Sequence, residues 1–106
     1  MAREKFQTLT EQMFYILLCL RREQCGVDIM EQVRTMTAGQ VVIGPGTLYS
    51  LLESFVQEGF IRETRAEGRR RSYIITSRGR ERLAEEHSRL LRQIRDYENS
   101  SEEVAP

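Results

Sequence analysis

Three consecutive arginines, Arg69, Arg70 and Arg71, stand between a glycine and a segment of high strand propensity. The chain has no net charge, but residues 61–82 carry eight arginines against three glutamates. Guanidinium groups concentrated in one short segment can bind the phosphates of a nucleic acid. The other interpretation is a solvated basic loop, and the neighbouring segments decide between the two.

A set of short hydrogen-bonding side chains precedes the arginines at helical spacing. Apolar residues from Leu48 to Val56 form one stripe of a predicted helix, which ends at Gly59. Short polar side chains on the opposite face can hydrogen-bond to base edges or phosphates in the major groove of DNA. This polar face carries Thr47, Ser50, Glu53, Ser54 and Gln57.

Two further helices are predicted before this one. Thr8 or Thr10 can cap a first helix that ends near Arg22, and because this helix is apolar nearly all round it should be buried. Asp28 can cap a second helix that ends before Gly39. We expect the inner face of the second helix to hold Ile29, Met30, Val33 and Met36.

A hairpin and a last helix follow. Segments 60–65 and 69–76 predict two strands joined by a tight turn that contains a glycine. Thr76 or Ser77 can cap a helix over 78–99, in which residues seven apart form an apolar seam along a charged rod. Because the three preceding helices bury their own stripes, this seam has no obvious partner within the chain and predicts a homodimer. The predicted interface residues are Leu83, His87, Leu90, Leu91, Ile94 and Tyr97.

The order of these elements predicts a mainly α fold of the α+β class, a winged helix-turn-helix followed by a C-terminal dimerisation helix. We assign the winged helix-turn-helix to residues 1–76, the dimerisation helix to 77–99 and a disordered polar tail to 100–106. In this arrangement the third helix enters the major groove of DNA, and the hairpin, or wing, reaches the adjacent backbone. Successive strand residues point to opposite faces, so Arg69 and Arg71 should share one face.

Catalytic and metal sites find little support in the sequence. His87 is the only histidine, so no Ser-His-Asp set can be assigned, and Cys19 and Cys25 lack the spacing of zinc ligands or of a disulfide framework. No apolar run approaches the roughly 18 residues of a membrane span, and the first residues show no signal-peptide pattern. We therefore expect a cytoplasmic protein that is not an enzyme, holds no metal or cofactor and does not enter a membrane.

Five short segments together carry a resemblance to a known family. They are Phe-Tyr-Ile-Leu-Leu at 14–18, Gly-Thr-Leu-Tyr-Ser-Leu-Leu-Glu at 46–53, Glu-Gly-Phe-Ile at 58–61, Gly-Arg-Arg-Arg-Ser-Tyr-Ile-Ile-Thr at 68–76 and Gly-Arg-Glu-Arg-Leu at 79–83. Over roughly residues 8–98 the chain resembles the PadR family of bacterial transcriptional regulators. Its single C-terminal helix resembles the compact subgroup of that family.

The resemblance implies a repressor that dimerises through its C-terminal helix and binds an inverted-repeat operator. It also implies a small aromatic or hydrophobic effector at the dimer interface, although a chain without tryptophan is not expected to form a drug pocket based on stacking. The alternative function is a winged-helix module that docks on an acidic protein surface and has no affinity for DNA.

Tyr49 has two compatible interpretations. Its position beside the apolar stripe predicts a half-buried side chain with its hydroxyl at the surface, and the resemblance implies that this hydroxyl contacts a phosphate. The residues expected to contact double-stranded DNA are Thr47, Tyr49, Ser50, Ser54, Gln57, Arg69, Arg70, Arg71, Ser72 and Tyr73.

Overall fold

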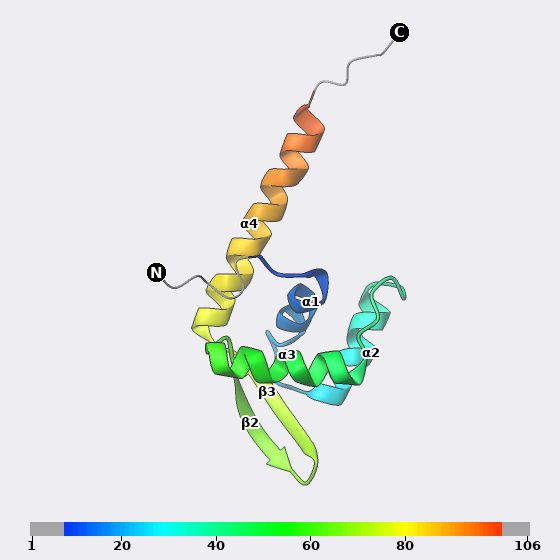
Figure 1. Ribbon diagram of the computed structural model, residues 1–106, viewed down its shortest axis with the longest axis vertical. Coiled ribbons are helices and arrows are strands. Elements are labelled where there is room, and N and C mark those ends of the chain that lie inside the picture. Colours follow the sequence, from blue (N-terminus) through cyan, green and yellow to red (C-terminus); the bar gives the residue numbers. More distant parts are fainter. Residues whose placement is uncertain (1–7, 101–106) are drawn as a thin grey trace.

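The computed structural model describes residues 8–100 and confirms the predicted α+β class. Three helices form a body, a hairpin extends from one side of it, and the last helix runs away from the body on the other side (Figure 1). The predicted disordered tail lies, apart from Ser100, outside the described residues. The elements are α1 (Glu11–Cys19), β1 (Gln24–Cys25), α2 (Gly26–Met36), α3 (Pro45–Glu58), β2 (Ile61–Glu67), β3 (Arg70–Ile75) and α4 (Ser77–Asn99).

Helix α1 begins where the sequence predicts but ends earlier. The Thr10 hydroxyl caps the helix by accepting a hydrogen bond from the Met13 amide at 3.2 Å. The last helical residue is Cys19, because the carbonyl of Leu20 accepts a hydrogen bond from the Ile75 amide at 2.8 Å. The chain after α1 is therefore bonded to the sheet instead of continuing the helix.

Strand β1 is the element that the sequence did not predict. It pairs antiparallel with β3, with Cys25 opposite Ser72, so the sheet order is β1-β3-β2. Pairing keeps the backbone extended through Cys25, which makes this residue the N-cap of α2. The helix consequently starts at Gly26, and Asp28 lies in its first turn rather than at the cap. A strand of two residues is too short to show the period that identifies strands in a sequence.

The hydrophobic core lies where α1, α2 and α3 meet the sheet. Burying a leucine or isoleucine side chain stabilises the fold by about 1.5–3 kcal/mol. Two predicted inner residues are exposed instead: Met36 lies in the last turn of α2, and Val56 lies at the edge of the buried arc of α3. The largest apolar side chains with no more than 2% of their surface exposed are Ile16, Leu17, Leu20, Ile29, Val33, Leu48, Leu52, Phe55 and Ile61.

Helix α4 is attached to the body by three hydrogen bonds of Thr76, the residue that caps the helix. The Thr76 hydroxyl accepts a hydrogen bond from the Gly79 amide at 3.1 Å and donates one to the Gly59 carbonyl at 2.6 Å. The Thr76 amide donates to the Phe60 carbonyl at 2.9 Å. The first turn of α4 is thereby bonded to the end of α3 and the start of β2.

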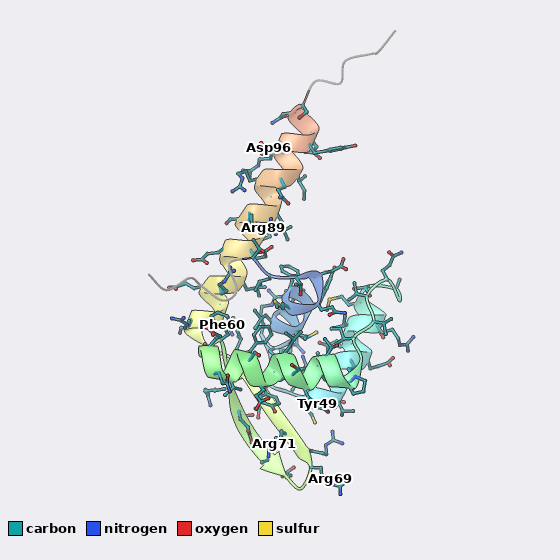
Figure 2. The ribbon with its side chains drawn as sticks, viewed as in Figure 1. Tyr49, Phe60, Arg69, Arg71, Arg89 and Asp96 are labelled. Atoms are coloured by element: carbon teal, nitrogen blue, oxygen red, sulfur yellow. The ribbon has the colours of Figure 1, made fainter. Side chains whose placement is uncertain are left out.

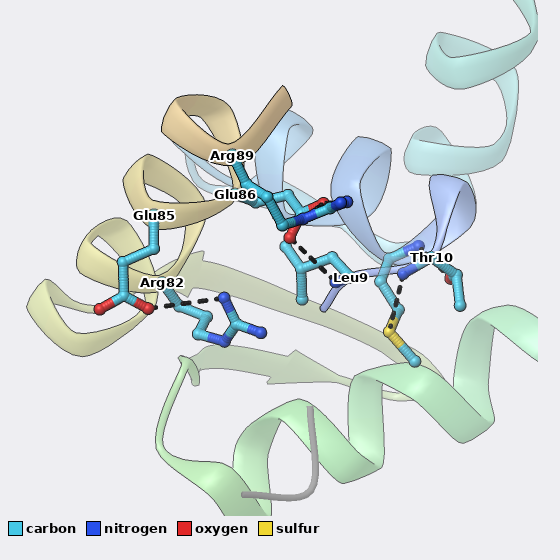
Figure 3. Close-up of polar contacts among 7 residues, drawn as sticks. Leu9, Thr10, Arg82, Glu85, Glu86 and Arg89 are labelled. Atoms are coloured by element: carbon cyan, nitrogen blue, oxygen red, sulfur yellow. Dashed lines mark hydrogen bonds and ion pairs between the residues drawn. The ribbon is translucent and has the colours of Figure 1, made fainter. Parts of the chain in front are cut away.

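A buried carboxylate joins α4 to the chain before α1. The side chain of Glu86, only 2% exposed, accepts a hydrogen bond from the Leu9 amide at 3.1 Å and forms an ion pair with Arg89 (Figure 3). The Arg89 guanidinium is the main cause that holds the pKa of Glu86 below its usual value, and the Leu9 amide adds to this effect against the opposing effect of burial.

Replacing Glu86 by glutamine should lower the free energy of unfolding at pH 7 by about 1.5 kcal/mol, because a charge-assisted hydrogen bond becomes a neutral one. A lowered pKa stabilises the fold fully above the ordinary value of 4.5 and ceases to do so as the pH falls through the lowered value. The free energies of unfolding of wild type and Glu86→Gln, measured with urea, should therefore converge as the pH is lowered below 4.5.

Glu81, on the same helix, provides the matched control for this experiment. Its side chain is exposed to solvent, so Glu81→Gln should cost less than about 0.5 kcal/mol at any of these pH values. Equal losses for the two variants would show that the Glu86 contacts do not carry the stability assigned to them.

The predicted dimer seam divides into two parts. Leu83 is 8% exposed and packs in the hydrophobic core of its own chain, so the expectation that the whole seam lacks a partner within the chain is wrong at this end. Leu90 is half-buried and His87 is exposed. Beyond them Leu91, Ile94 and Tyr97 are 36%, 51% and 84% exposed, and their place in an interface stays a prediction.

Candidate nucleic-acid interface

The exposed face of α3 is set by how this helix is capped and packed. Gly44 is its N-cap and Pro45, in the first turn, needs no amide partner there. Gly59 ends the helix with a φ of 80°, in the left-handed region that favours glycine. Because Leu48, Leu52 and Phe55 face the core, the opposite face is turned to solvent. On that face Thr47, Ser50 and Gln57 are exposed and Ser54 is half-buried.

Tyr49 lies at the flank of this face, over the start of α2. Its side chain is 48% exposed, and its ring is so close to Gly26 that a Cβ atom added there would lie 3.1 Å from the ring carbon Cε1. The same Cβ would lie 3.6 Å from the hydroxyl oxygen. Figure 2 shows Tyr49 on the side of α3 that turns toward the wing. The side chain is therefore more exposed than the predicted half-buried position, although one edge of its ring packs against the start of α2.

The three wing arginines are all exposed, and they occupy different positions. Arg69 lies in the turn at the tip of the wing, outside the strands (Figure 2). Arg71 reaches Glu63 across the hairpin at 3.4 Å, whereas Arg70 reaches Asp28 of α2 at 4.0 Å. The different partners of Arg70 and Arg71 agree with strand alternation, which does not extend to Arg69 because β3 begins at Arg70.

The last two predicted DNA contacts are less accessible than expected. Tyr73 is only 7% exposed, and burial is the main cause that raises the pKa of its hydroxyl above the usual value. It shares a face of β3 with the buried Ile75, and both side chains pack in the hydrophobic core. Ser72 is half-buried and pairs with both flanking strands. These two residues support the wing from within rather than offering exposed groups to DNA.

Acidic side chains lie among the wing arginines, and two of them come from outside the basic segment 61–82 and were not predicted to lie there. Besides Glu63, which contacts Arg71, the carboxylate of Glu23 lies 3.9 Å from Arg65 and that of Asp28 reaches Arg70. Glu23 and Asp28 lie well before residues 61–82 in the sequence, so a count of the charges in that segment does not include them. Only the pairing of β1 with β3 brings them together, and no signal in the sequence shows that pairing.

An apolar groove lies between α1 and α4. Its volume is about 370 Å³, and Arg21 and Arg80 add cationic groups to its lining. The thiol of Cys19, nearby on α1, is buried, and burial raises its pKa to about 11, so it is not a reactive thiolate at neutral pH. The remaining lining residues of the groove are Phe14, Leu18, Leu83, Ala84 and His87.

The part of the chain that the structure describes shows neither a metal cluster nor a membrane span. Residues 8–100 contain no group of three or more histidine, cysteine, aspartate or glutamate side chains that could hold a metal ion. Within the same range, every helix is too short or too polar to cross a membrane.

Comparison with known protein families identifies one family. Residues 16–85 match the family described as the transcriptional regulator PadR-like family. A transcriptional regulator from Clostridium thermocellum is similar in structure, with a TM-score of 0.68 and 26% identity over 82% of this chain and 91% of that chain. No curated protein sequence is similar enough to this chain to count as a relative.

Two more distant structures share the fold. RosR of H. salinarum has a TM-score of 0.70 and 20% identity, over 82% of this chain and 78% of that chain. PadR of Bacillus subtilis, solved in complex with operator DNA, has a TM-score of 0.59 and 21% identity, over 87% of this chain and 49% of that chain.

Proposed function

Since the chain belongs to the transcriptional regulator PadR-like family, we propose that this DNA-binding regulator is a repressor that binds an inverted-repeat operator as a homodimer in the cytoplasm. The observation that carries the proposal is the exposed polar face of α3 beside exposed wing arginines. In a winged helix the polar face of the third helix meets base edges in the major groove, and the arginines of the wing meet the phosphate backbone.

The homodimer is supported by the form of α4. This helix of 23 residues extends beyond the body (Figure 1), and its far half exposes Leu91, Ile94 and Tyr97. A second copy of the same stripe would cover these side chains in an isologous contact. A two-fold dimer presents two α3 helices to DNA, so its operator should have two-fold symmetry with half-sites about 34–36 Å apart.

The proposed effector is a small aromatic carboxylate that binds the groove between α1 and α4. This groove is lined mostly by apolar side chains together with the guanidinium groups of Arg21 and Arg80, a chemistry that suits a small aromatic carboxylate. Because α4 also carries the dimer stripe, a ligand there could change how the two protomers are held. Adding a panel of aromatic carboxylates to the protein–DNA complex and following fluorescence anisotropy tests this, and an unchanged affinity throughout the panel argues against it.

The experiment that tests DNA recognition is anisotropy with the duplex immediately upstream of the chain's own gene and a scrambled duplex, at two salt concentrations. Tight binding that prefers the native duplex and weakens steeply with salt supports the proposal. No binding to either duplex at low salt contradicts it and favours a module that docks on proteins.

Replacing Arg70 and Arg71 together by alanine should weaken binding to native and scrambled duplexes by similar factors, because phosphate contacts carry no sequence information. The plot of log affinity against log salt should become shallower by about 0.9 for each phosphate that the variant no longer neutralises. The same anisotropy titrations measure both effects.

The control for this variant removes two charges elsewhere. Arg92→Ala with Arg95→Ala takes both from the far end of α4, away from the wing (Figure 1), and should leave the salt dependence nearly unchanged. If the wing variant lost only its preference for the native duplex, the wing would be reading bases rather than phosphates.

A further inference from the structure

Two carboxylates on either side of β1 each contact an arginine of the wing. Glu23 directly precedes β1 and lies 3.9 Å from the Nε atom of Arg65. Asp28, in the first turn of α2, lies 4.0 Å from an Nη atom of Arg70. We call Glu23 and Asp28 the acidic bracket. The acids and the arginines line one shallow polar groove of about 400 Å³.

The sheet register holds the acidic bracket against the wing. Cys25 of β1 is opposite Ser72 of β3, which places the residues just before and after β1 beside the hairpin. Glu23 is fixed further by the Thr64 hydroxyl, which donates a hydrogen bond to its carboxylate at 2.6 Å. Thr64 lies where the register of β2 against β3 shifts, so the contact forms at an irregular point of the hairpin.

These ion pairs contribute little to the stability of the fold. The side chains of Asp28 and Arg70 are 62% and 65% exposed, and exposed pairs of this kind gain little because water screens them. The same carboxylates have a larger effect on how strongly the wing arginines attract a DNA phosphate. A carboxylate beside a guanidinium lowers the positive potential that attracts DNA, and it competes with a phosphate for the same guanidinium.

We propose that the acidic bracket is an electrostatic brake on DNA binding, in which Asp28 and Glu23 compete with DNA phosphates for Arg70 and Arg65. This inference rests on the proposed function, because it assumes that the wing meets the DNA backbone. The brake acts on DNA of any sequence and leaves discrimination between sequences to α3.

Asp28→Asn tests the brake by removing the charge and keeping the shape of the side chain. Affinity for native and scrambled duplexes should rise about fivefold at low salt, and the gain should shrink as salt screens the charges. The slope of log affinity against log salt should steepen, because each wing then has one more arginine available to a phosphate. Circular dichroism confirms that the variant is folded.

The matched control is Glu31→Gln, which removes the same charge from the same helix. Glu31 pairs with Arg34 at 2.8 Å and with Thr35, not with the wing. An equal gain in affinity from Glu31→Gln and Asp28→Asn would overturn the brake, because net charge alone would then explain the effect.

A double-mutant cycle identifies the arginine that the brake acts on. In the Arg70→Ala background, Asp28→Asn should no longer tighten DNA binding, because the pair no longer exists. An undiminished gain in that background overturns the proposal and leaves direct repulsion between Asp28 and DNA. If wild type binds DNA and Asp28→Asn binds it no better, the brake fails while the proposed function stands. If no variant binds DNA at low salt, both fail.

Discussion

Replacing Gly79 by alanine should lower the free energy of unfolding by about 3 kcal/mol, which for a domain of this size lowers the melting temperature by roughly 15 °C. A Cβ atom at this position would lie 2.1 Å from the backbone oxygen of Phe60 and 2.7 Å from a side-chain carbon of Ile75. The Phe60 carbonyl cannot move aside freely, because it also accepts the hydrogen bond from the Thr76 amide. The first turn of α4 must therefore shift away from the body.

The helix propensity of alanine opposes this loss but is too weak to offset it. Alanine is better than glycine in a helix by about 1 kcal/mol, whereas forcing atoms into a packed backbone contact costs more. Gly46→Ala is the matched control, since Gly46 also lies in the first turn of a helix and an added Cβ meets nothing within 4 Å. Thermal and urea unfolding should show Gly46→Ala at least as stable as wild type. If Gly79→Ala were equally stable, α4 would not pack on Phe60 as closely as the structure has it.

Local signals explain why much of the fold could be predicted. Gly59 indicates the end of α3, leucines at helical spacing indicate its inner stripe, and the residues between them indicate its polar face. The threonine caps of α1 and α4 are likewise encoded within a single turn. The exposed face of α3 and the exposed wing arginines follow from this local information, so the sequence alone is enough to place them.

Contacts between distant segments explain what could not be predicted. Strand β1 exists only because β3, more than forty residues later, pairs with it. The Leu9 amide meets Glu86 across 77 residues, and Glu23 meets Thr64 across 41. Tyr73 is an intermediate case, since its spacing of two from Ile75 indicates a shared buried face, but its place beside the arginines favoured an exposed one.

Replacing Ile94 by arginine should convert the proposed homodimer into monomers and reduce affinity for a two-half-site operator about 100-fold, because two linked contacts become independent. Ile94 is 51% exposed and lies outside the core of its own protomer, so the substitution should not unfold the winged helix. A charged guanidinium at this position would have to lose its water in the interface and would not provide the apolar contact of isoleucine. Sedimentation velocity measures the change in mass, and anisotropy measures the loss of affinity.

The control must separate a disrupted interface from an added charge, which by itself strengthens attraction to DNA. Ser88→Arg adds the same charge to α4, and since Ser88 precedes Ile94 by six residues it lies about 120° around the helix. That variant should remain a dimer with undiminished affinity. Binding of Ile94→Arg to a single half-site should equal that of wild type, because α3 and the wing are unchanged. A dimer that survives Ile94→Arg would remove the exposed stripe of α4 from the interface and with it the geometric basis for a two-fold operator.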